Sequence, residues 1–481
     1  MTIYYSHYPT TSEGSPLKLN TISCKLTPVI ATGIVWLLCE IATIAGFAGM
    51  AEAQVSFGVK PYTCVRNFYV NGATGQDVST SGSQSHPWKT IQYANDNAGL
   101  KAGDCVNVAA GTYAQPGTQG MGLTLSTSGN ANIPTGYVTY IGEPNHATRI
   151  TGSASTFSLV RITGSYIIID GFDLDGTGTP DYVVSNNPPS SGGAGHHLMV
   201  LNNLIHGSGG GGVGFEHTDY FTVIGNTVYN TSTTSPYQES GISIYEPAAI
   251  QNFTPILVWD TAAFHIVVAN NIVYNNAETM AGAHSDGNGI IIDDWLHTQQ
   301  SPNKPYPYGG LVQSNLSYNN GGKGIQVFLS LNVTVANNTV FNNNLDLQNN
   351  GTWRGELDNA ASNNVTWINN IAWSQPISSD VRQYNTAVLM GTYGGYSLDN
   401  VVWKQNLTFN GTSGNSSASL PTPAQLSAFL SANKAGVNPL LRYLQPLSNS
   451  PVISSGCPTP AYLPISLYCN AMGTPPDIGA Y

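Results

Sequence analysis

A short pattern recurs through the chain from about residue 196 and restricts the folds that it can adopt. Alternating apolar residues are followed by Asn, an apolar pair and often a second Asn, as in Val-Ile-Gly-Asn-Thr-Val-Tyr-Asn at 223–230. Alternation with a period of two predicts strands, and the intervening Gly and Asn predict turns. A repeat of about 23 residues predicts a solenoid with one anchoring Asn in each coil. These Asn residues stand at 203, 226, 271, 315, 338, 370 and 406.

A second kind of strand begins after a Gly once in each coil. Four such strands follow Gly212, Gly241, Gly289 and Gly324, which we expect to lie in consecutive coils of one parallel sheet. Side chains alternate along a strand, so the first and third residues after each Gly should point into the core. These residues are Val213, Phe215, Ile242, Ile244, Ile290, Ile292, Ile325 and Val327.

Both ends of the chain carry further recognisable segments. They include Phe-Tyr-Val-Asn at 68–71, His-Pro-Trp-Lys-Thr-Ile-Gln at 86–92, and a closing Asp-Ile-Gly-Ala-Tyr at 477–481. With the repeat, these segments resemble pectate lyases, nearest to the family 9 polysaccharide lyases, and also polygalacturonases, over most of residues 66–481. The resemblance implies an all-β, right-handed parallel β-helix. An amphipathic segment at 90–100 is expected to be an N-terminal capping helix that covers the open strand edges.

The first 53 residues are predicted to be a signal peptide. Two Lys residues precede an apolar run at 29–50, and Ala-Glu-Ala at 51–53 suits a signal peptidase. A membrane anchor is the alternative, because the run approaches the length that spans a bilayer. Residues 54–481 would then form one secreted or periplasmic β-helix domain without membrane insertion. It would have an N-terminal cap at 54–115 and a closing segment at 450–481.

Charge and cysteine content restrict the partners and the compartment. Only 9% of the residues are charged and the net charge is −11, which excludes nucleic acid as a partner because phosphate binding needs clustered Lys and Arg. The cysteines of the mature chain lack CxxC spacing, so disulfides are favoured over zinc. The expected pairs are Cys64 with Cys105 and Cys457 with Cys469. We expect a monomer.

Acidic residues align on the outer face of the predicted sheet. The fourth position after each Gly carries Glu216, Tyr245, Asp293 or Phe328, and the fifth carries His217, Glu246, Asp294 or Leu329. Neighbouring coils lie about 4.8 Å apart, so Glu246 and Asp294 should stack. Stacked like charges destabilise a sheet, which predicts a bound cation, a shared proton or a basic partner.

A second set of polar residues stands just before the glycines. It consists of Ser240, Asn288, Lys323 and Arg354, with Glu239, Asp286 and Glu356 nearby in sequence. Loops that follow the acidic positions carry aromatic residues, which either stack on sugar rings or pack on the solenoid. The predicted substrate contacts are His217, Glu216, Trp295, Tyr245, Asn288 and Glu356.

The resemblance to family 9 lyases implies a calcium-dependent β-elimination on an acidic, uronate-containing polysaccharide. Lys323 would be the base, and Arg354 would bind the substrate carboxylate or lower the pKa of Lys323. The calcium ligands would be oxygen atoms of Asp293, Asp294, Glu246 and Asp286. The predicted catalytic set is Lys323, Asp293, Asp294 and Arg354.

Two alternatives remain open at this point. The same residues resemble those of polygalacturonases, in which Asp293 and Asp294 would act as acid and base of a glycoside hydrolase. The second alternative is a non-catalytic carbohydrate-binding or surface β-helix protein. The concentration of charge on one face favours an enzyme over this alternative.

Overall fold

The structure is a computed structural model in two units, 1–54 with 441–445 and 55–440 with 446–481. It describes residues 2–4, 21–23 and 60–479, except 116–120, 133–134, 155, 187–194, 251–263, 281–283, 300–303, 350–352, 413–416, 443, 454 and 456–477. In the first unit, β1 (Thr2–Tyr4) pairs antiparallel with β2 (Thr21–Ser23). The rest of the predicted signal peptide lies outside the described residues. No helix in the described ranges is long and apolar enough to cross a membrane.

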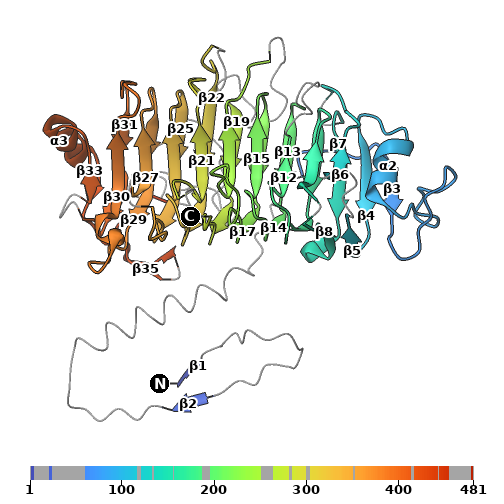
Figure 1. The fold of residues 1–481 in the computed structure, drawn as a ribbon, viewed down its shortest axis with the longest axis horizontal. Coiled ribbons are helices and arrows are strands. Elements are labelled where there is room, and N and C mark those ends of the chain that lie inside the picture. Colours follow the sequence, from blue (N-terminus) through green and yellow to red (C-terminus); the bar gives the residue numbers. More distant parts are fainter. Residues whose placement is uncertain are drawn as a thin grey trace. The chain divides into compact units, whose positions relative to one another are not determined.

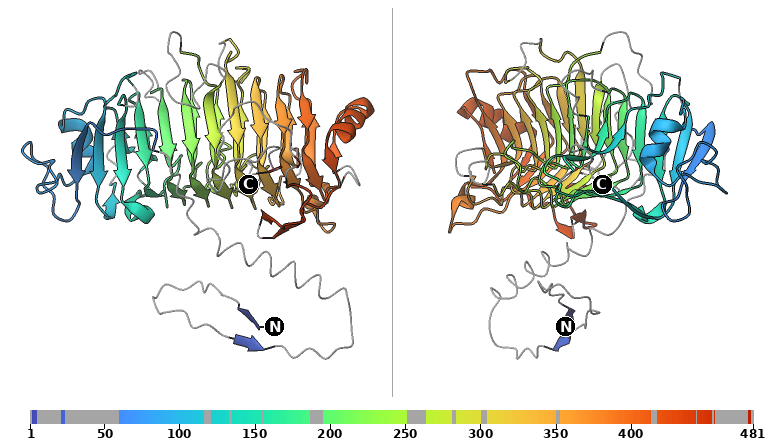
Figure 2. Two further views of the ribbon diagram at one scale, coloured as in Figure 1. Left: turned by 180° about the vertical axis from the view of Figure 1, so that it is seen from behind. Right: turned by 45° about the vertical axis from the view of Figure 1, so that its right-hand side comes forward.

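The second unit contains three long parallel sheets (Figures 1 and 2). The first sheet consists of β3 (Arg66–Val70), β4 (Asp104–Val108), β7 (Val138–Gly142), β10 (Ile167–Asp170), β13 (Leu198–Leu201), β16 (Phe221–Ile224), β19 (Phe264–Ala269), β22 (Gly309–Gln313), β25 (Val333–Ala336), β28 (Thr366–Ile368) and β31 (Val402–Lys404). The second consists of β5 (Gly111–Ala114), β8 (Thr148–Thr151), β11 (Asp173–Asp175), β14 (Leu204–His206), β17 (Thr227–Tyr229), β20 (Ile272–Tyr274), β23 (Leu316–Tyr318), β26 (Thr339–Phe341), β29 (Ile371–Trp373), β32 (Leu407–Phe409) and β34 (Lys434–Ala435).

The third sheet contains the predicted Gly-started strands. It consists of β6 (Met121–Leu125), β9 (Ser158–Ile162), β12 (Val184–Ser185), β15 (Val213–Glu216), β18 (Ile242–Tyr245), β21 (Ile290–Asp293), β24 (Ile325–Phe328), β27 (Gly355–Ala360), β30 (Thr386–Gly391) and β33 (Ala418–Ser419). Most coils contribute one strand to each sheet, so the chain is a right-handed parallel β-helix, as predicted. Ile242, Ile290 and Ile325 pair in consecutive strands, which confirms the alignment of the Gly-started segments.

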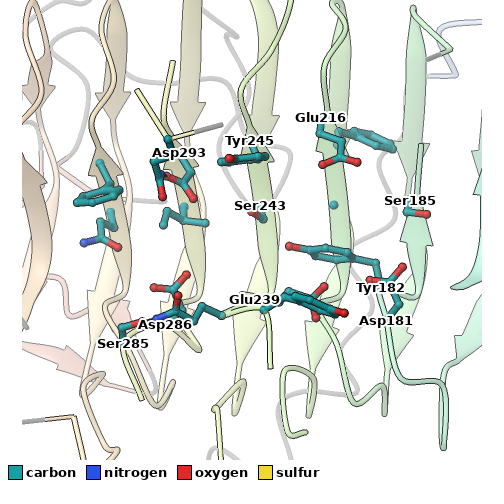
Figure 3. Close-up of a pocket in the computed structure, with 18 of the residues that line it drawn as sticks. Asp181, Tyr182, Ser185, Glu216, Glu239, Ser243, Tyr245, Ser285, Asp286 and Asp293 are labelled. Atoms are coloured by element: carbon teal, nitrogen blue, oxygen red, sulfur yellow. Dashed lines mark hydrogen bonds between the residues drawn. The ribbon is translucent and has the colours of Figure 1, made fainter. Parts of the chain in front are cut away.

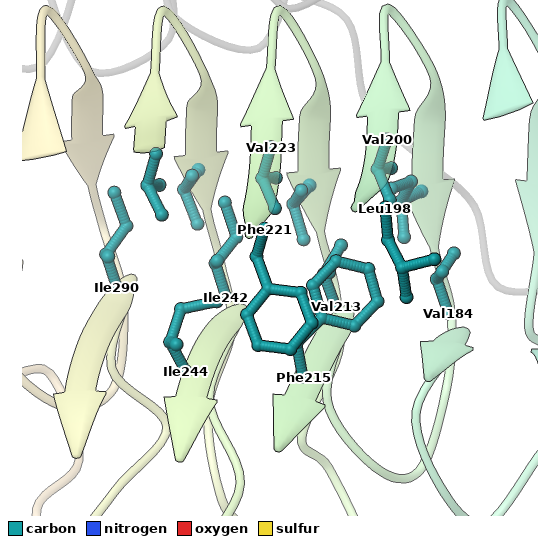
Figure 4. Packing of buried hydrophobic residues seen from close by; sticks show 14 of the residues in the cluster. Val184, Leu198, Val200, Val213, Phe215, Phe221, Val223, Ile242, Ile244 and Ile290 are labelled. Carbon is teal, nitrogen blue, oxygen red and sulfur yellow. The ribbon is translucent and has the colours of Figure 1, made fainter. Parts of the chain in front are cut away.

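The core fills the interior of the coils with the predicted apolar side chains. Figure 4 shows Val213, Phe215, Ile242 and Ile244 of the third sheet facing residues of the first sheet, and the four are at most 1% exposed. The rings of Phe215 and Phe221 stack with centroids 4.7 Å apart. Burial of one such side chain contributes about 1.5–3 kcal/mol, so the repeated apolar pattern stabilises every coil.

The anchoring Asn residues form a buried ladder along the solenoid. In each step, the backbone N–H and the side-chain amide of one Asn donate to the side-chain oxygen of the Asn in the next coil. For Asn271 and Asn315 both distances are 3.0 Å. The ladder satisfies polar groups that would otherwise be buried without partners. It runs through Asn203, Asn226, Asn271, Asn315, Asn338, Asn370, Asn406 and Asn433.

The predicted capping helix is α2 (Ile91–Asn97), which begins at the N-cap Thr90. Gln92 of this helix accepts from the backbone N–H of Thr124 at 2.9 Å and donates to its carbonyl at 3.0 Å. Asn95 accepts from the N–H of Ser126 at 3.1 Å. Because β6 is the edge strand of the third sheet, these side chains replace the missing neighbouring strand.

The remaining elements lie outside the three sheets. Cys64 and Cys105 form a disulfide, as predicted, whereas the predicted pair Cys457 and Cys469 lies outside the described residues. The helix α3 begins with a capping box of Thr422 and Gln425. The bounds are α3 (Pro423–Ala432), the 3-10 helices η1 (Pro144–His146) and η2 (Val381–Tyr384), and the strands β35 (Leu441–Arg442) and β36 (Gln445–Pro446).

Candidate active site

An elongated cavity of about 630 Å³ lies on the outer face of the third sheet (Figure 3). Its lining includes one outward-pointing residue from each of five consecutive strands. Neighbouring strands lie about 4.8 Å apart, so four steps between them span about 19 Å. The cavity therefore has the proportions of a chain-like ligand. The five residues are Ser185, Gly214, Ser243, Ile291 and Gln326.

The predicted outward row at the ends of these strands also lines the cavity. Glu216 pairs with Tyr245, Tyr245 with Asp293, and Asp293 with Phe328 in successive strands. Figure 3 shows Glu216, Tyr245 and Asp293 in one line above the strands. The register predicted from the Gly positions is therefore correct, and it brings these side chains to one surface.

Asp293 presents its carboxyl group to the cavity from the end of β21. Its Oδ1 accepts a hydrogen bond from Gln299 Nε2 at 3.2 Å. Burial raises the pKa of Asp293 well above its usual range, and the nearby charges of Asp286 and Asp294 act in the same direction. Asp293 therefore keeps its proton to a higher pH than an exposed aspartic acid does.

The fifth positions after the glycines turn away from this row. The backbone φ angles of His217, Glu246 and Asp294 are 55°, 38° and 48°, in the left-handed region. A residue in this conformation changes the direction of the chain at the end of the strand. Glu246 and Asp294 are consequently buried beneath the turn and do not line the cavity. The same holds for Leu329, with a φ of 45°.

Asp294 holds the turn that follows it. Its carboxylate accepts from the Thr298 N–H at 2.8 Å and the Gln299 N–H at 2.6 Å. Burial raises the pKa of Asp294, and a hydrogen bond with Glu246 acts in the same direction. The carboxyl groups of Glu246 and Asp294 are therefore hydrogen-bonded to each other. His217 lies beside them, with Nδ1 3.8 Å from Glu246 Oε2, and 39% of its side chain is exposed.

Lys323 supplies the amine of the cavity. The residue is only 1% exposed, and its Nζ donates to the carbonyl of Ser285 at 2.7 Å. Burial lowers the pKa of Lys323, and the charge of Arg354 also lowers it. The carboxyl groups of Asp286, Asp358 and Glu278 act in the opposite direction but do not cancel the effect of burial.

Asp286 also reaches the cavity, because the turn that precedes β21 brings it there. Burial raises the pKa of Asp286 to about 6, against the effects of Lys323 and Asn288. Asn288 does not line the cavity; it supports residues that do. Its Oδ1 accepts from the Lys323 N–H at 2.8 Å, and its Nδ2 donates to Gln326 Oε1 at 3.2 Å.

Three predicted site residues lie in the structural framework instead. Trp295 is fully buried in the hydrophobic core and donates to the carbonyl of Ile244, so the prediction that it contacts substrate is wrong. Glu356 is also fully buried; it accepts from the side chain and N–H of Asn343 and does not line the cavity. It ends a second ladder of Thr231, Asn276, Asn320 and Asn343.

Arg354 is the third of these residues. It is 3% exposed and donates to the side chain of Asn385 at 2.7 Å and to the backbone carbonyls of Asn344, Asp346 and Asn349. Since these bonds direct the guanidinium away from the cavity, direct binding of a substrate carboxylate is not supported. Its effect on the pKa of Lys323 corresponds to the other predicted role.

The cavity has a further acidic end, of which the sequence pattern indicated only Glu239. Asp181, Tyr182 and Glu239 line this end. The carboxyl groups of Asp181 and Glu239 are hydrogen-bonded to each other. Burial and the charge of Asp181 raise the pKa of Glu239 to about 9. Asp181 and Tyr182 precede β12, which has only two residues and no preceding Gly, so the alignment of Gly-started strands could not find them.

The predicted calcium ligands are only partly brought together. Asp286 and Asp293 line the cavity, whereas Asp294 and Glu246 are buried and bonded to each other. Within the described ranges, no group of three or more His, Cys, Asp or Glu side chains is arranged to hold a metal ion. The four-residue site therefore does not fit the ion as predicted, and two acidic residues remain at the cavity.

Comparisons with known proteins give distant structural matches. The chain is similar to pectate lyase Pel9A, with 16% identity, a TM-score of 0.46, and coverage of 90% of this chain and 99% of that one. A rhamnogalacturonan lyase matches with 14% identity, a TM-score of 0.38, and coverage of 71% and 87%. A lacto-N-biosidase from Eubacterium ramulus matches with 12% identity, a TM-score of 0.40, and coverage of 71% and 56%. No family model and no curated protein matched the chain.

Proposed function

We propose that the protein is a secreted polysaccharide lyase that cleaves a uronate-containing polysaccharide in the cavity of the third sheet. The observation that carries the proposal is the buried amine of Lys323, whose pKa is lowered although three carboxyl groups oppose the shift. A general base needs a pKa close to the working pH, and burial is the usual way to lower that of a lysine. The length of the cavity supports a polymer as substrate.

In this mechanism the neutral amine of Lys323 removes the proton from the carbon next to the uronate carboxylate. The C–O bond at the neighbouring carbon breaks as a C=C double bond forms, and the leaving oxygen takes a proton. The net reaction consumes no water and leaves a 4,5-unsaturated uronate. The bonds from Lys323 to Ser285 and Asn288 hold the amine and its backbone in place, which supports the required positioning.

In the proposed mechanism, two acidic residues instead of the predicted four would bind calcium. Five acidic residues line the cavity, so an anionic substrate requires a cation or bound protons to offset the repulsion. Asp286 and Asp293 would hold the ion together with the substrate carboxylate and water, since calcium takes six to eight oxygen ligands. A bound ion would neutralise the uronate and acidify its C–H bond.

The direct test is the product. The protein is incubated with a panel of uronans, and the ultraviolet absorbance of unsaturated uronate is followed in the presence of calcium. We expect absorbance to rise with at least one uronan and no solvent oxygen to enter the cleaved bond. Solvent label at a new reducing end, without unsaturated product, would contradict the lyase assignment.

A glycoside hydrolase is the second candidate. Asp286 and Asp293 both line the cavity, and the pKa of each is raised, that of Asp286 to about 6. One protonated and one ionised carboxyl group are the requirement for acid and base roles in glycoside hydrolysis. Asp286 replaces Asp294 in this candidate, because the Asp294 carboxylate accepts hydrogen bonds from the backbone of the turn that follows it. Absence of both kinds of product would favour the non-catalytic alternative.

A further inference from the structure

Three aromatic rings gather at one end of the cavity, next to Asp293. Phe328 is the neighbour of Asp293 in the next strand, and it lines the cavity with Trp353 and Tyr393. The ring centroids of Phe328 lie 5.8 Å from Trp353 and 5.3 Å from Tyr393, and those of Trp353 and Tyr393 lie 5.8 Å apart. We call these three residues the aromatic platform.

Small residues make room for the platform. The row of Asp293 and Phe328 continues with Ala360 and then Gly391 in the following strands. A Cβ atom at Gly391 would lie 2.5 Å from Nε1 of Trp353, closer than real contacts allow. The indole therefore lies directly against the sheet at a position where only glycine fits.

The platform differs from the aromatic pairs that stabilise the solenoid. Trp367 and Trp403 stack with centroids 4.8 Å apart, and they are 0% and 7% exposed. Tyr393 is 52% exposed, and Phe328 and Trp353 are partly exposed beside it. Apolar rings left open to a cavity bury less surface than they would in the core, so folding alone does not explain their position.

We infer that the aromatic platform is a sugar subsite that stacks one pyranose ring of the polysaccharide beside the bond cleaved near Lys323. None of the three rings carries a charge, whereas the acidic residues that line the cavity belong to the preceding coils, with Asp293 the one next to Phe328. The subsite therefore recognises the apolar C–H face of a sugar and not a carboxylate. This inference rests on the proposed function for its ligand, but it concerns binding, which does not require cleavage.

Affinity electrophoresis tests the inference separately from turnover. Wild-type protein and variants run in gels that contain polygalacturonate, alginate, galactan or xylan, with calcium present, and the dissociation constant is obtained from the retardation. Trp353→Ala and Tyr393→Ala should each bind the retarding polysaccharide about threefold to tenfold more weakly, which is the magnitude of one aromatic contact. Trp353→Phe should recover most of the loss.

Two further variants separate the possible results. Tyr384→Ala removes an aromatic side chain that is 63% exposed outside the cavity, and it should bind like the wild type. Lys323→Ala should lose turnover and keep retardation. Unchanged retardation of both platform variants would overturn the subsite, whatever the turnover, and so would a wild-type protein that no polysaccharide retards. If the platform variants lose retardation and the wild-type protein forms no unsaturated product, the result would support the subsite and contradict the lyase.

Discussion

Asp293 and Asp294 are adjacent in the chain, yet their carboxyl groups serve different parts of the molecule. Asp293 lines the cavity and accepts from Gln299 Nε2, whereas Asp294 is buried and accepts from the backbone of Thr298 and Gln299. The left-handed φ of 48° at Asp294 separates the two directions. The pair therefore connects the cavity to the turn that follows β21.

This relationship predicts opposite effects for two equivalent substitutions. Asp293→Asn should lower turnover by about 100-fold or more, the lower range for an acid–base or ligand group, with little effect on stability. Asp294→Asn should lower the free energy of unfolding by about 1–3 kcal/mol, because its amide group would meet the N–H donors of the turn. Turnover and urea denaturation of both variants measure the two effects. The reverse pattern would show that the roles are misassigned.

The sequence was sufficient for the features that follow the strand period. Alternation and the spacing of Asn and Gly predicted the parallel sheet, its register and the row of Glu216, Tyr245 and Asp293. The sequence was insufficient where the backbone departs from the two-residue alternation of a strand. The direction of Asp294 depends on a φ angle, and the position of Arg354 depends on carbonyls of residues 344–349 that curl around it. Neither feature has a periodic signal in the sequence.

The protonation of Lys323 should govern the pH dependence of turnover. Because burial lowers its pKa below the ordinary 10.5, the neutral amine appears at lower pH than in an exposed lysine, and activity should rise with pH through that lowered value. Lys323→Arg keeps the charge and cannot lose its proton, so turnover should fall by about 100-fold or more. Lys101→Arg, at an exposed position, serves as the matched control. An active Lys323→Arg variant would exclude the base role.

Removal of calcium should abolish turnover and lower the melting temperature. An ion that binds only the folded protein stabilises it by mass action, so the melting temperature should rise again with added calcium. Asp286→Asn and Asp293→Asn should each weaken this response, because they remove the two carboxyl groups at the cavity that are proposed to hold the ion. Calorimetry with and without chelator measures the effect. Full activity after exhaustive chelation would remove calcium from the mechanism and favour the hydrolase.

The Asn ladder should be a main source of stability. Asn315 accepts from the backbone and side chain of Asn271 and donates to Asn338 and to the carbonyl of Val268. Asn315→Ala would leave these buried groups without partners, at a cost of about 3 kcal/mol or more in unfolding free energy. Asn67→Ala, at an exposed position of β3, should change it by less than about 0.5 kcal/mol. Equal urea midpoints for the two variants would contradict the role of the ladder.

Buried acids should make the protein less stable at alkaline pH, and Glu278 provides a test. It is 2% exposed, and burial together with the charge of Asp286 raises its pKa from 4.5 to about 9. The folded form keeps a proton that the unfolded form releases, so this contribution to stability is complete below pH 4.5 and is lost as pH rises through about 9. The free energy of unfolding should therefore fall across this range.

The variant Glu278→Gln carries no titrating proton and should lose stability less steeply over the same range. It should match the wild type near pH 5 and have the higher melting temperature near pH 9. Its Oε1 can still accept the N–H bond that Asp286 donates to Glu278 at 3.2 Å, so the turn should remain intact. Glu143→Gln, at an exposed position, is the control and should follow the wild type at every pH. Parallel curves for wild type and Glu278→Gln would mean that Glu278 is not protonated in the folded protein.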